Sequence, residues 1–210
     1  MKRSTCTAIF ATFLLTVVMH AASAQAVPSY DLRDITVGMP IGNLPNEGYV
    51  NLSCAGQPDR QLAAWSGWRD CPADEQGRRA VRFEFDPETS QDGTKVAGHP
   101  VLLTAVIDDN ATVFGLTIQT DPKARLYIRK KAFLLGNQVK SRYGAEGWDC
   151  KEQQPSAGEQ PVGGVFLREV CKKAIPGRML TVERELFRKP DQDIKNFVDQ
   201  TMVQITKQTN

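Results

Sequence analysis

Histidine, cysteine and paired carboxylates are the side chains in this sequence that could carry out acid–base or nucleophilic chemistry. His99 is the only histidine after residue 26, so a Ser-His-Asp or Cys-His catalytic site would have to use it. The sequence contains no G-x-S-x-G, S-x-x-K or H-E-x-x-H pattern, no calcium loop and no phosphate-binding glycine loop. We therefore interpret His99 as a loop histidine beside Pro100.

Two pairs of carboxylates lie two residues apart, which places both members of a pair on one face of a strand. Glu84 and Asp86 form the first pair, and Glu183 and Glu185 form the second. Glycosidases need only two such groups, but the alternation of the strands puts both pairs opposite an apolar face. We therefore interpret them as parts of a solvated sheet face. The sequence leaves enzymatic activity open and favours a protein without catalysis.

The first 26 residues are typical of a secretory signal peptide. Lys2 and Arg3 precede an apolar run over 8–19, and small residues follow it. The run is shorter than the roughly 20 residues that span a bilayer. We expect cleavage after Ala24 or Ala26, which predicts a periplasmic or secreted chain without a transmembrane span.

Four cysteines stay in the chain after this cleavage. In an exported protein they favour two disulfides. Pairing between near neighbours predicts the bonds Cys54–Cys71 and Cys150–Cys171. No C-x-x-C pattern occurs, and one histidine is a poor basis for a metal site. We predict neither a metal nor a cofactor.

A basic segment over 122–145 is the least expected feature of the charge pattern. Removal of Lys2 and Arg3 with the signal leaves equal numbers of basic and acidic residues, which argues against nucleic acid as a partner. The segment nevertheless carries seven cations and no acid. These are Lys123, Arg125, Arg129, Lys130, Lys131, Lys140 and Arg142. They predict a contact surface for anionic lipid, an acidic polymer or an acidic protein, unless acids elsewhere in the fold pair with them.

Alternation of apolar and polar residues predicts most of the strands. It is clearest over 81–86, and two apolar runs over 100–120 are broken by Asp108-Asp109-Asn110, as in an antiparallel hairpin. Further strands are predicted over 165–170 and 179–187. A short strand is predicted over 34–37 and a short helix within 57–70.

Two longer helices are predicted from apolar residues at intervals of three and four. The first covers 122–143, with Asp121 as its N-cap and Gly144 as its C-terminal cap. Its apolar stripe consists of Ala124, Ile128, Ala132, Leu135, Val139 and Tyr143. The second covers 191–207, with Ile194, Phe197, Val198, Met202 and Ile205 at helical spacing. Together these elements predict one α+β domain over 27–210, an antiparallel sheet with one long and one C-terminal helix packed on it.

The stretch WSGWRDC places Trp65 and Trp68 close to Cys71. We interpret it as a small core that is closed by the Cys54–Cys71 disulfide and covers the strand over 81–85. An alternative function uses Trp65, Trp68 and Trp148 to line a groove for a small ligand or an anionic glycan.

Two short segments carry a resemblance to small bacterial envelope proteins. The residues concerned are Ile35, Val37, Gly38 and Met39 in DLRDITVGMPIGNLP, and Tyr143 and Gly144 in SRYGAEGWDC. The outline resembles outer-membrane assembly lipoproteins of the SmpA/OmlA type and β-lactamase-inhibitor-like domains. The chain is most similar to exported proteobacterial proteins of unknown function with two disulfides. This resemblance implies an envelope protein that binds other proteins, and it transfers no catalytic residue.

The leading hypothesis is therefore a periplasmic interaction or accessory module without catalysis. Its contact surface would be the basic helix over 122–143. Its partner would be an acidic protein or an anionic component of the envelope.

Overall fold

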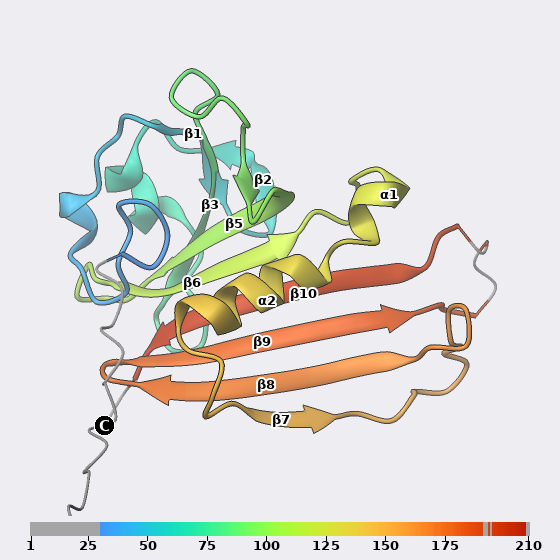
Figure 1. The fold of residues 1–210 in the computed structure, drawn as a ribbon. Coiled ribbons are helices and arrows are strands. Elements are labelled where there is room, and N and C mark those ends of the chain that lie inside the picture. The colour runs from blue at the N-terminus through green and yellow to red at the C-terminus, as the bar shows by residue number, and fades with distance from the viewer. Residues whose placement is uncertain (1–29, 191–192, 194, 209–210) are drawn as a thin grey trace, which may run out of the picture.

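The dominant feature of the protein is a single antiparallel sheet (Figure 1). The structure is a computed structural model and describes residues 30–190, 193 and 195–208. The strand order is β2-β1-β3-β5-β6-β10-β9-β8-β7, with β4 paired to β5. The strands are β1 (Tyr49–Cys54), β2 (Gln57–Gln61), β3 (Arg79–Phe85), β4 (Lys95–Val96), β5 (His99–Ile107), β6 (Val113–Thr120), β7 (Asp149–Glu152), β8 (Leu167–Ile175), β9 (Arg178–Phe187) and β10 (Val198–Lys207). The predicted signal peptide over 1–26 lies outside the described residues. Within them, no helix has the length and apolar character needed to cross a membrane.

The strands predicted from alternation over 81–86, 100–120, 165–170 and 179–187 are confirmed as β3, β5 with β6, β8 and β9. Along β5 every second side chain is buried, which is the pattern of a strand with one face on the core. The turn between β5 and β6 is closed by Asp108. Its Oδ1 accepts hydrogen bonds from the backbone N–H groups of Asn110 and Thr112, at 3.0 and 2.9 Å.

The predicted C-terminal helix is wrong, because residues 198–207 form strand β10 in the middle of the sheet. β10 pairs with β6 on one side and with β9 on the other. Its buried residues are Asp199, Thr201, Val203 and Ile205, which recur with a period of two. The described residues are therefore mostly antiparallel β structure, with α-helix only within 126–142, and the predicted α+β class with two packed helices is corrected.

The predicted helix over 122–143 is shorter than expected and is broken into α1 (Leu126–Arg129) and α2 (Phe133–Arg142). Asp121 does not cap the helix. Its Oδ1 accepts the backbone N–H of Lys123 at 2.8 Å and closes a turn instead. Gly144 follows α2 in the left-handed region at φ +90°, as predicted. Figure 1 shows α2 lying across β9 and β10.

Gly136 allows α2 to approach the sheet closely. A Cβ at this position would lie 3.2 Å from Val182 Cγ1 and 3.5 Å from Thr201 Cγ2. Glycine costs a helix up to about 1 kcal/mol relative to alanine, and this contact explains why it is tolerated here.

Gly136→Leu is expected to lower the free energy of unfolding by about 1–3 kcal/mol, since the larger side chain must push α2 away from the sheet. Gly136→Ala should change it by less than about 1 kcal/mol, because gained helix propensity offsets the tight contact. Urea denaturation measures both effects. Gln138→Leu, on the exposed side of α2, is the matched control, and equal stabilities of the two leucine variants would contradict the close packing.

The N-terminal part of the chain forms turns and two 3-10 helices, η1 (Ile41–Asn43) and η2 (Trp65–Asp70). The predicted strand over 34–37 is wrong, because Ile35 pairs only with Leu32 in a turn. The predicted helix within 57–70 is wrong over its first part, which is strand β2.

The apolar residues of WSGWRDC are buried and closed by a disulfide, as predicted, but they belong to the main hydrophobic core and not to a separate small one. Trp65 and Trp68 are each 2% exposed. The Trp65 ring meets those of Phe83 and Tyr49 edge to face, at centroid distances of 5.1 and 5.6 Å. Both disulfides form with the predicted pairing, Cys54–Cys71 and Cys150–Cys171.

Candidate functional site

The seven cations of the basic segment do not form one surface, because three of them bind other parts of the chain. Arg129 donates from Nη1 to the carbonyl oxygen of Phe197 at 3.1 Å and from Nη2 to that of Lys195 at 3.0 Å. Lys140 Nζ lies 3.4 Å from a carboxylate oxygen of Glu169. Arg142 donates to the carbonyl oxygen of Tyr30. These three side chains fasten the helical segment to the rest of the fold.

The other four cations are exposed: Lys123, Arg125, Lys130 and Lys131. Within the described part of the chain, no hydrogen bond or ion pair engages any of their side chains. They flank α1 on both sides. The segment over 122–145 supplies no acid of its own, and the nearest acid in the sequence, Asp121, accepts the backbone N–H of Lys123 rather than pairing with a cation.

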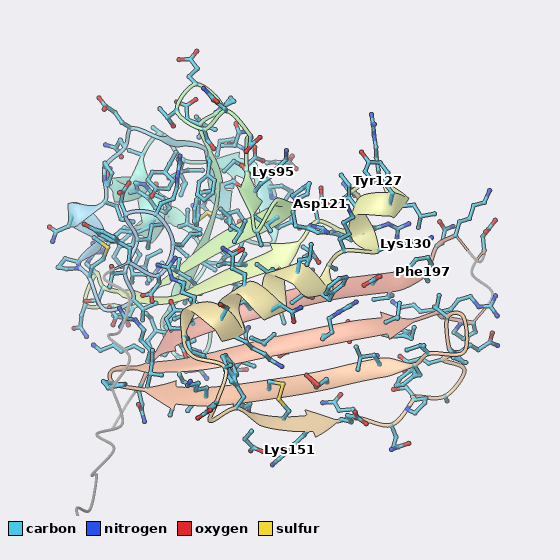
Figure 2. All side chains as sticks on the ribbon, viewed as in Figure 1. Lys95, Asp121, Tyr127, Lys130, Lys151 and Phe197 are labelled. Carbon is cyan, nitrogen blue, oxygen red and sulfur yellow. A yellow bond between two sulfur atoms is a disulfide. The ribbon has the colours of Figure 1, made fainter. Side chains whose placement is uncertain are left out.

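Three exposed apolar side chains lie in the same segment as these cations, one between them and two shortly after Lys131. Tyr127 is 59% exposed, Phe133 45% and Leu134 39%. α1 itself has no buried residue, although three of its four residues are apolar or aromatic. We call the set Lys123, Arg125, Tyr127, Lys130, Lys131, Phe133 and Leu134 the α1 tip. Figure 1 shows α1 beyond the end of β6 and clear of the strands, and Figure 2 shows Tyr127 and Lys130 on it.

The apolar members of the α1 tip were missed by sequence reasoning. The predicted stripe contains the residues that pack on the sheet, and Leu135, Val139 and Tyr143 are indeed buried. Tyr127 and Phe133 lie outside that stripe, so the core does not use them. Large apolar residues outside the core stripe of a helix are the signal that could have identified the tip.

His99 helps to hold α1 in place and is buried, with 2% of its surface exposed. It is the first residue of β5, which corrects its interpretation as a loop histidine. Its Nδ1 lies 2.8 Å from the carbonyl oxygen of Pro100, and its Nε2 lies 3.0 Å from that of Ile128 in α1. A ring nitrogen engaged by a backbone carbonyl is not directed at a substrate, so the geometry assigns His99 a structural contact.

The carboxylate pairs have structural partners. Glu84 Oε2 accepts a hydrogen bond from Asn51 Nδ2 at 2.9 Å, and Glu185 lies 3.2 Å from Arg168 Nε. Glu84 is exposed between the buried rings of Phe83 and Phe85, as the alternation predicts. Neither pair encloses a site with a positioned acid and base.

The three tryptophans do not share a groove. Trp65 and Trp68 are buried in the core beside β3, whereas Trp148 is half-buried and donates from Nε1 to the carbonyl oxygen of Gly144 at 2.8 Å. The burial of Trp65 and Trp68 removes the indole surfaces on which the ligand-binding alternative depends.

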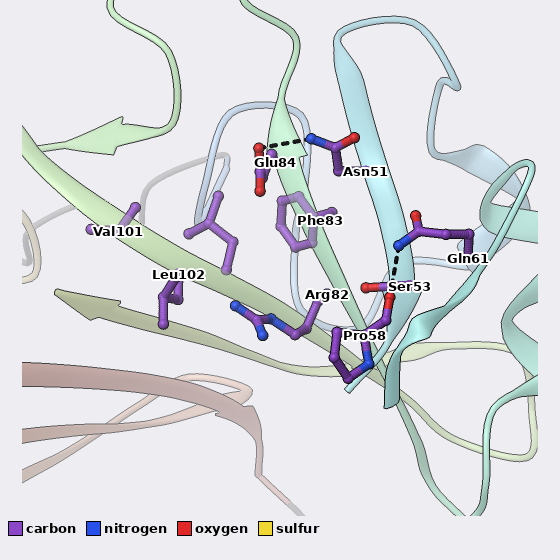
Figure 3. Close-up of a pocket in the computed structure, with 10 residues that line it drawn as sticks. Asn51, Ser53, Pro58, Gln61, Arg82, Phe83, Glu84, Val101 and Leu102 are labelled. Carbon is purple, nitrogen blue, oxygen red and sulfur yellow. Dashed lines mark hydrogen bonds between the residues drawn. The ribbon is translucent and has the colours of Figure 1, made fainter. Parts of the chain in front are cut away.

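A pocket of about 270 Å³ lies where β1, β2, β3 and β5 meet (Figure 3). Its lining includes Asn51, Ser53, Pro58, Gln61, Arg82, Glu84 and Leu102. Gln61 Nε2 donates to the carbonyl oxygen of Pro58 at 2.7 Å, both residues lying in β2. The lining contains no histidine, cysteine or tryptophan, so neither His99 nor the proposed aromatic groove is located here.

Cys150, Glu169 and Cys171 place their ligand atoms within 4.8 Å of one another. The two sulfur atoms are bonded to each other, which leaves no thiolate for a metal ion. Lys140 Nζ lies 3.1 Å from Cys171 Sγ, so a cation of the chain already adjoins this cluster.

Comparison with models of protein families, with curated proteins and with solved structures finds no match to this chain. The resemblance to small bacterial envelope proteins of the SmpA/OmlA type stays a prediction.

Proposed function

We propose that this protein is an exported interaction module without catalysis, and that it contacts an anionic partner through the α1 tip. The observation that carries this proposal is a short segment with four exposed cations, none of them paired with a carboxylate among the described residues, and three exposed apolar side chains. Large apolar side chains that the core leaves exposed, in a segment rich in unpaired charge, are candidates for an interaction site.

Two disulfides support a location in the periplasm or outside the cell, because disulfides persist in oxidising compartments. The proposed partner is an acidic protein or an anionic component of the envelope, since complementary charge steers association. Nothing in the described site geometry supplies the nucleophile, base and oxyanion donors that would favour an enzyme.

The α1 tip is held in position before any partner binds. Arg129 and His99 fix the inner side of α1 through backbone carbonyls, while Tyr127 faces away from the core at 59% exposure. A surface that is already ordered loses less conformational entropy on binding, which favours affinity.

The test is capture of partners from an envelope extract by the tagged protein. Arg125→Gln, Lys130→Gln and Lys131→Gln together should reduce capture about tenfold or more at low salt, because rim charges govern the association rate and its salt dependence. Arg129 is left unchanged, since it holds the backbone at Phe197. Lys151→Gln with Lys172→Gln, both exposed on β7 and β8, is the control. Equal capture by the two multiple variants would contradict the proposal.

A further inference from the structure

We propose that the anionic partner of the α1 tip is the surface of a lipid bilayer that contains anionic lipids. This inference rests on the proposed function and names the partner of the same site. Three observations support it: the exposed apolar side chains of the tip, the predominance of lysine among its cations, and its shape.

The apolar side chains of the tip do not pack in the hydrophobic core. Leu135 and Val139 pack α2 on the sheet, and Gly136 brings it close. Tyr127, Phe133 and Leu134 stay exposed. Tyrosine and other aromatic side chains are favoured at the boundary between headgroups and acyl chains, where one end of the ring is apolar and the other is hydrated.

The cations of the tip are mostly lysines, namely Lys123, Lys130 and Lys131, with Arg125 as the fourth. The central parts of protein–protein interfaces are enriched in arginine and depleted in lysine. Long lysine side chains can keep their ammonium groups at headgroup level while their methylene stems cover apolar surface. Each cation near an anionic bilayer strengthens binding about fivefold, and the effect falls off within a Debye length.

The shape of the tip also favours a bilayer over a folded protein. α1 has only four residues, none of them buried, and it stands clear of the strands (Figure 1). A stable protein–protein interface buries about 800 Å² on each partner and needs a matching surface. A fluid bilayer can surround a small projecting tip without such a match, as it does for interfacial helices.

The experiment measures sedimentation of the purified exported protein with lipid vesicles. One set contains only phosphatidylcholine, and in the other about a third of the lipid is phosphatidylglycerol. We expect binding to the anionic vesicles alone at about 0.1 M salt and its loss at about 1 M salt, where the Debye length falls to about 3 Å. Lys130→Gln with Lys131→Gln should weaken this binding about 25-fold, since two cations are removed.

A second pair of variants tests the apolar contribution. Tyr127→Ser with Phe133→Ser should weaken binding to anionic vesicles at least about tenfold, because two aromatic side chains no longer enter the interface. Tyr30→Ser removes an aromatic side chain that is 52% exposed but lies outside the tip, and it should leave binding unchanged. Lys151→Gln with Lys172→Gln is the matched charge control. All of these side chains are exposed, and unchanged thermal unfolding verifies the fold of each variant.

The outcomes separate this inference from the proposed function. Absence of vesicle binding, together with salt-sensitive capture of an acidic protein that the tip variants lose, would overturn the lipid inference and leave the proposed function intact. Vesicle binding that the tip variants do not alter would also overturn it. Failure of both vesicle binding and tip-dependent capture would overturn both.

Discussion

Replacement of Asp31 by alanine is expected to lower the free energy of unfolding by about 3–5 kcal/mol, because it leaves a buried guanidinium without its partner. The Asp31 side chain is fully buried, with 0% exposure, and lies 2.9 Å from Arg178 Nε. It also accepts hydrogen bonds of 2.7 Å from the backbone N–H of Val37 and from the hydroxyl of Tyr143. Chemical denaturation followed by circular dichroism measures the loss.

The effect is large because one carboxylate joins three parts of the chain. Val37 belongs to the N-terminal turns, Tyr143 follows α2, and Arg178 begins β9. Burial, with the adjacent Asp31 carboxylate, raises the pKa of the Tyr143 hydroxyl well above its usual range. The hydroxyl therefore stays protonated at alkaline pH values at which an ordinary tyrosine would ionise, and it continues to donate to Asp31 there.

Two further variants separate the charge from the hydrogen bonds. Asp31→Asn keeps one acceptor oxygen but removes the charge, so its loss of stability should fall between those of Asp31→Ala and the wild type. Asp70→Ala replaces an exposed aspartate and should change stability by less than about 0.5 kcal/mol. If Asp31→Ala cost as little as Asp70→Ala, the network around Asp31 would not stabilise the fold.

The double variant Cys54→Ala, Cys71→Ala is expected to lose about 3 kcal/mol by chain entropy alone, and more through lost packing. The bond closes a sequence separation of 17 residues and joins β1 to the end of η2. Both cysteines are buried, at 0% and 3% exposure. Without the bond, η2 can separate from β3 and expose Trp65. Chemical denaturation and hydrogen exchange of the β1 and β3 amides measure the two consequences.

The second disulfide provides a matched comparison. Cys150–Cys171 closes a similar separation of 21 residues, but it fastens β7, an edge strand whose four residues are all exposed. Cys150→Ala with Cys171→Ala should therefore increase hydrogen exchange in β7 while β1 and β3 stay protected. Equal exchange of β1 and β3 in both double variants would contradict the separate roles of the two bonds.

Strands with regular alternation could be predicted from the sequence because their signal is local. Val81, Phe83 and Phe85 alternate with polar residues, and Asp108 supplies a turn between two apolar runs. The two disulfides followed from an exported chain with four cysteines and short separations. None of these predictions depends on contacts between distant parts of the sequence.

The strand β10 could not be identified in this way, because two buried polar residues conceal its alternation. Asp199 pairs with Arg184 of β9, and Thr201 donates from Oγ1 to the carbonyl oxygen of Ala132 at 2.8 Å. When Asp199 and Thr201 are counted as polar, the apolar residues that remain recur at intervals typical of a helix. Pairing with β6 and β9 determines the strand, and those partners are remote in sequence.

The candidate site was predicted in part. Composition alone identified the basic segment, but it could not show which cations are available to a partner. Arg129, Lys140 and Arg142 bind groups at Phe197, Glu169 and Tyr30, all distant in sequence. Only the folded chain shows that the remaining four, and Tyr127 and Phe133 in the same segment, are exposed.

Photo-crosslinking tests most directly whether the α1 tip is the contact surface. A photoreactive phenylalanine derivative replaces Tyr127 in one variant and Lys151 in another. Figure 2 shows Tyr127 on α1 and Lys151 on the far edge of the sheet. Both side chains are exposed, so both probes can react in intact cells. We expect adducts from position 127 that disappear when Arg125, Lys130 and Lys131 are changed to glutamine. Adducts from position 151 with none from position 127 would contradict the assignment of the contact surface to the α1 tip.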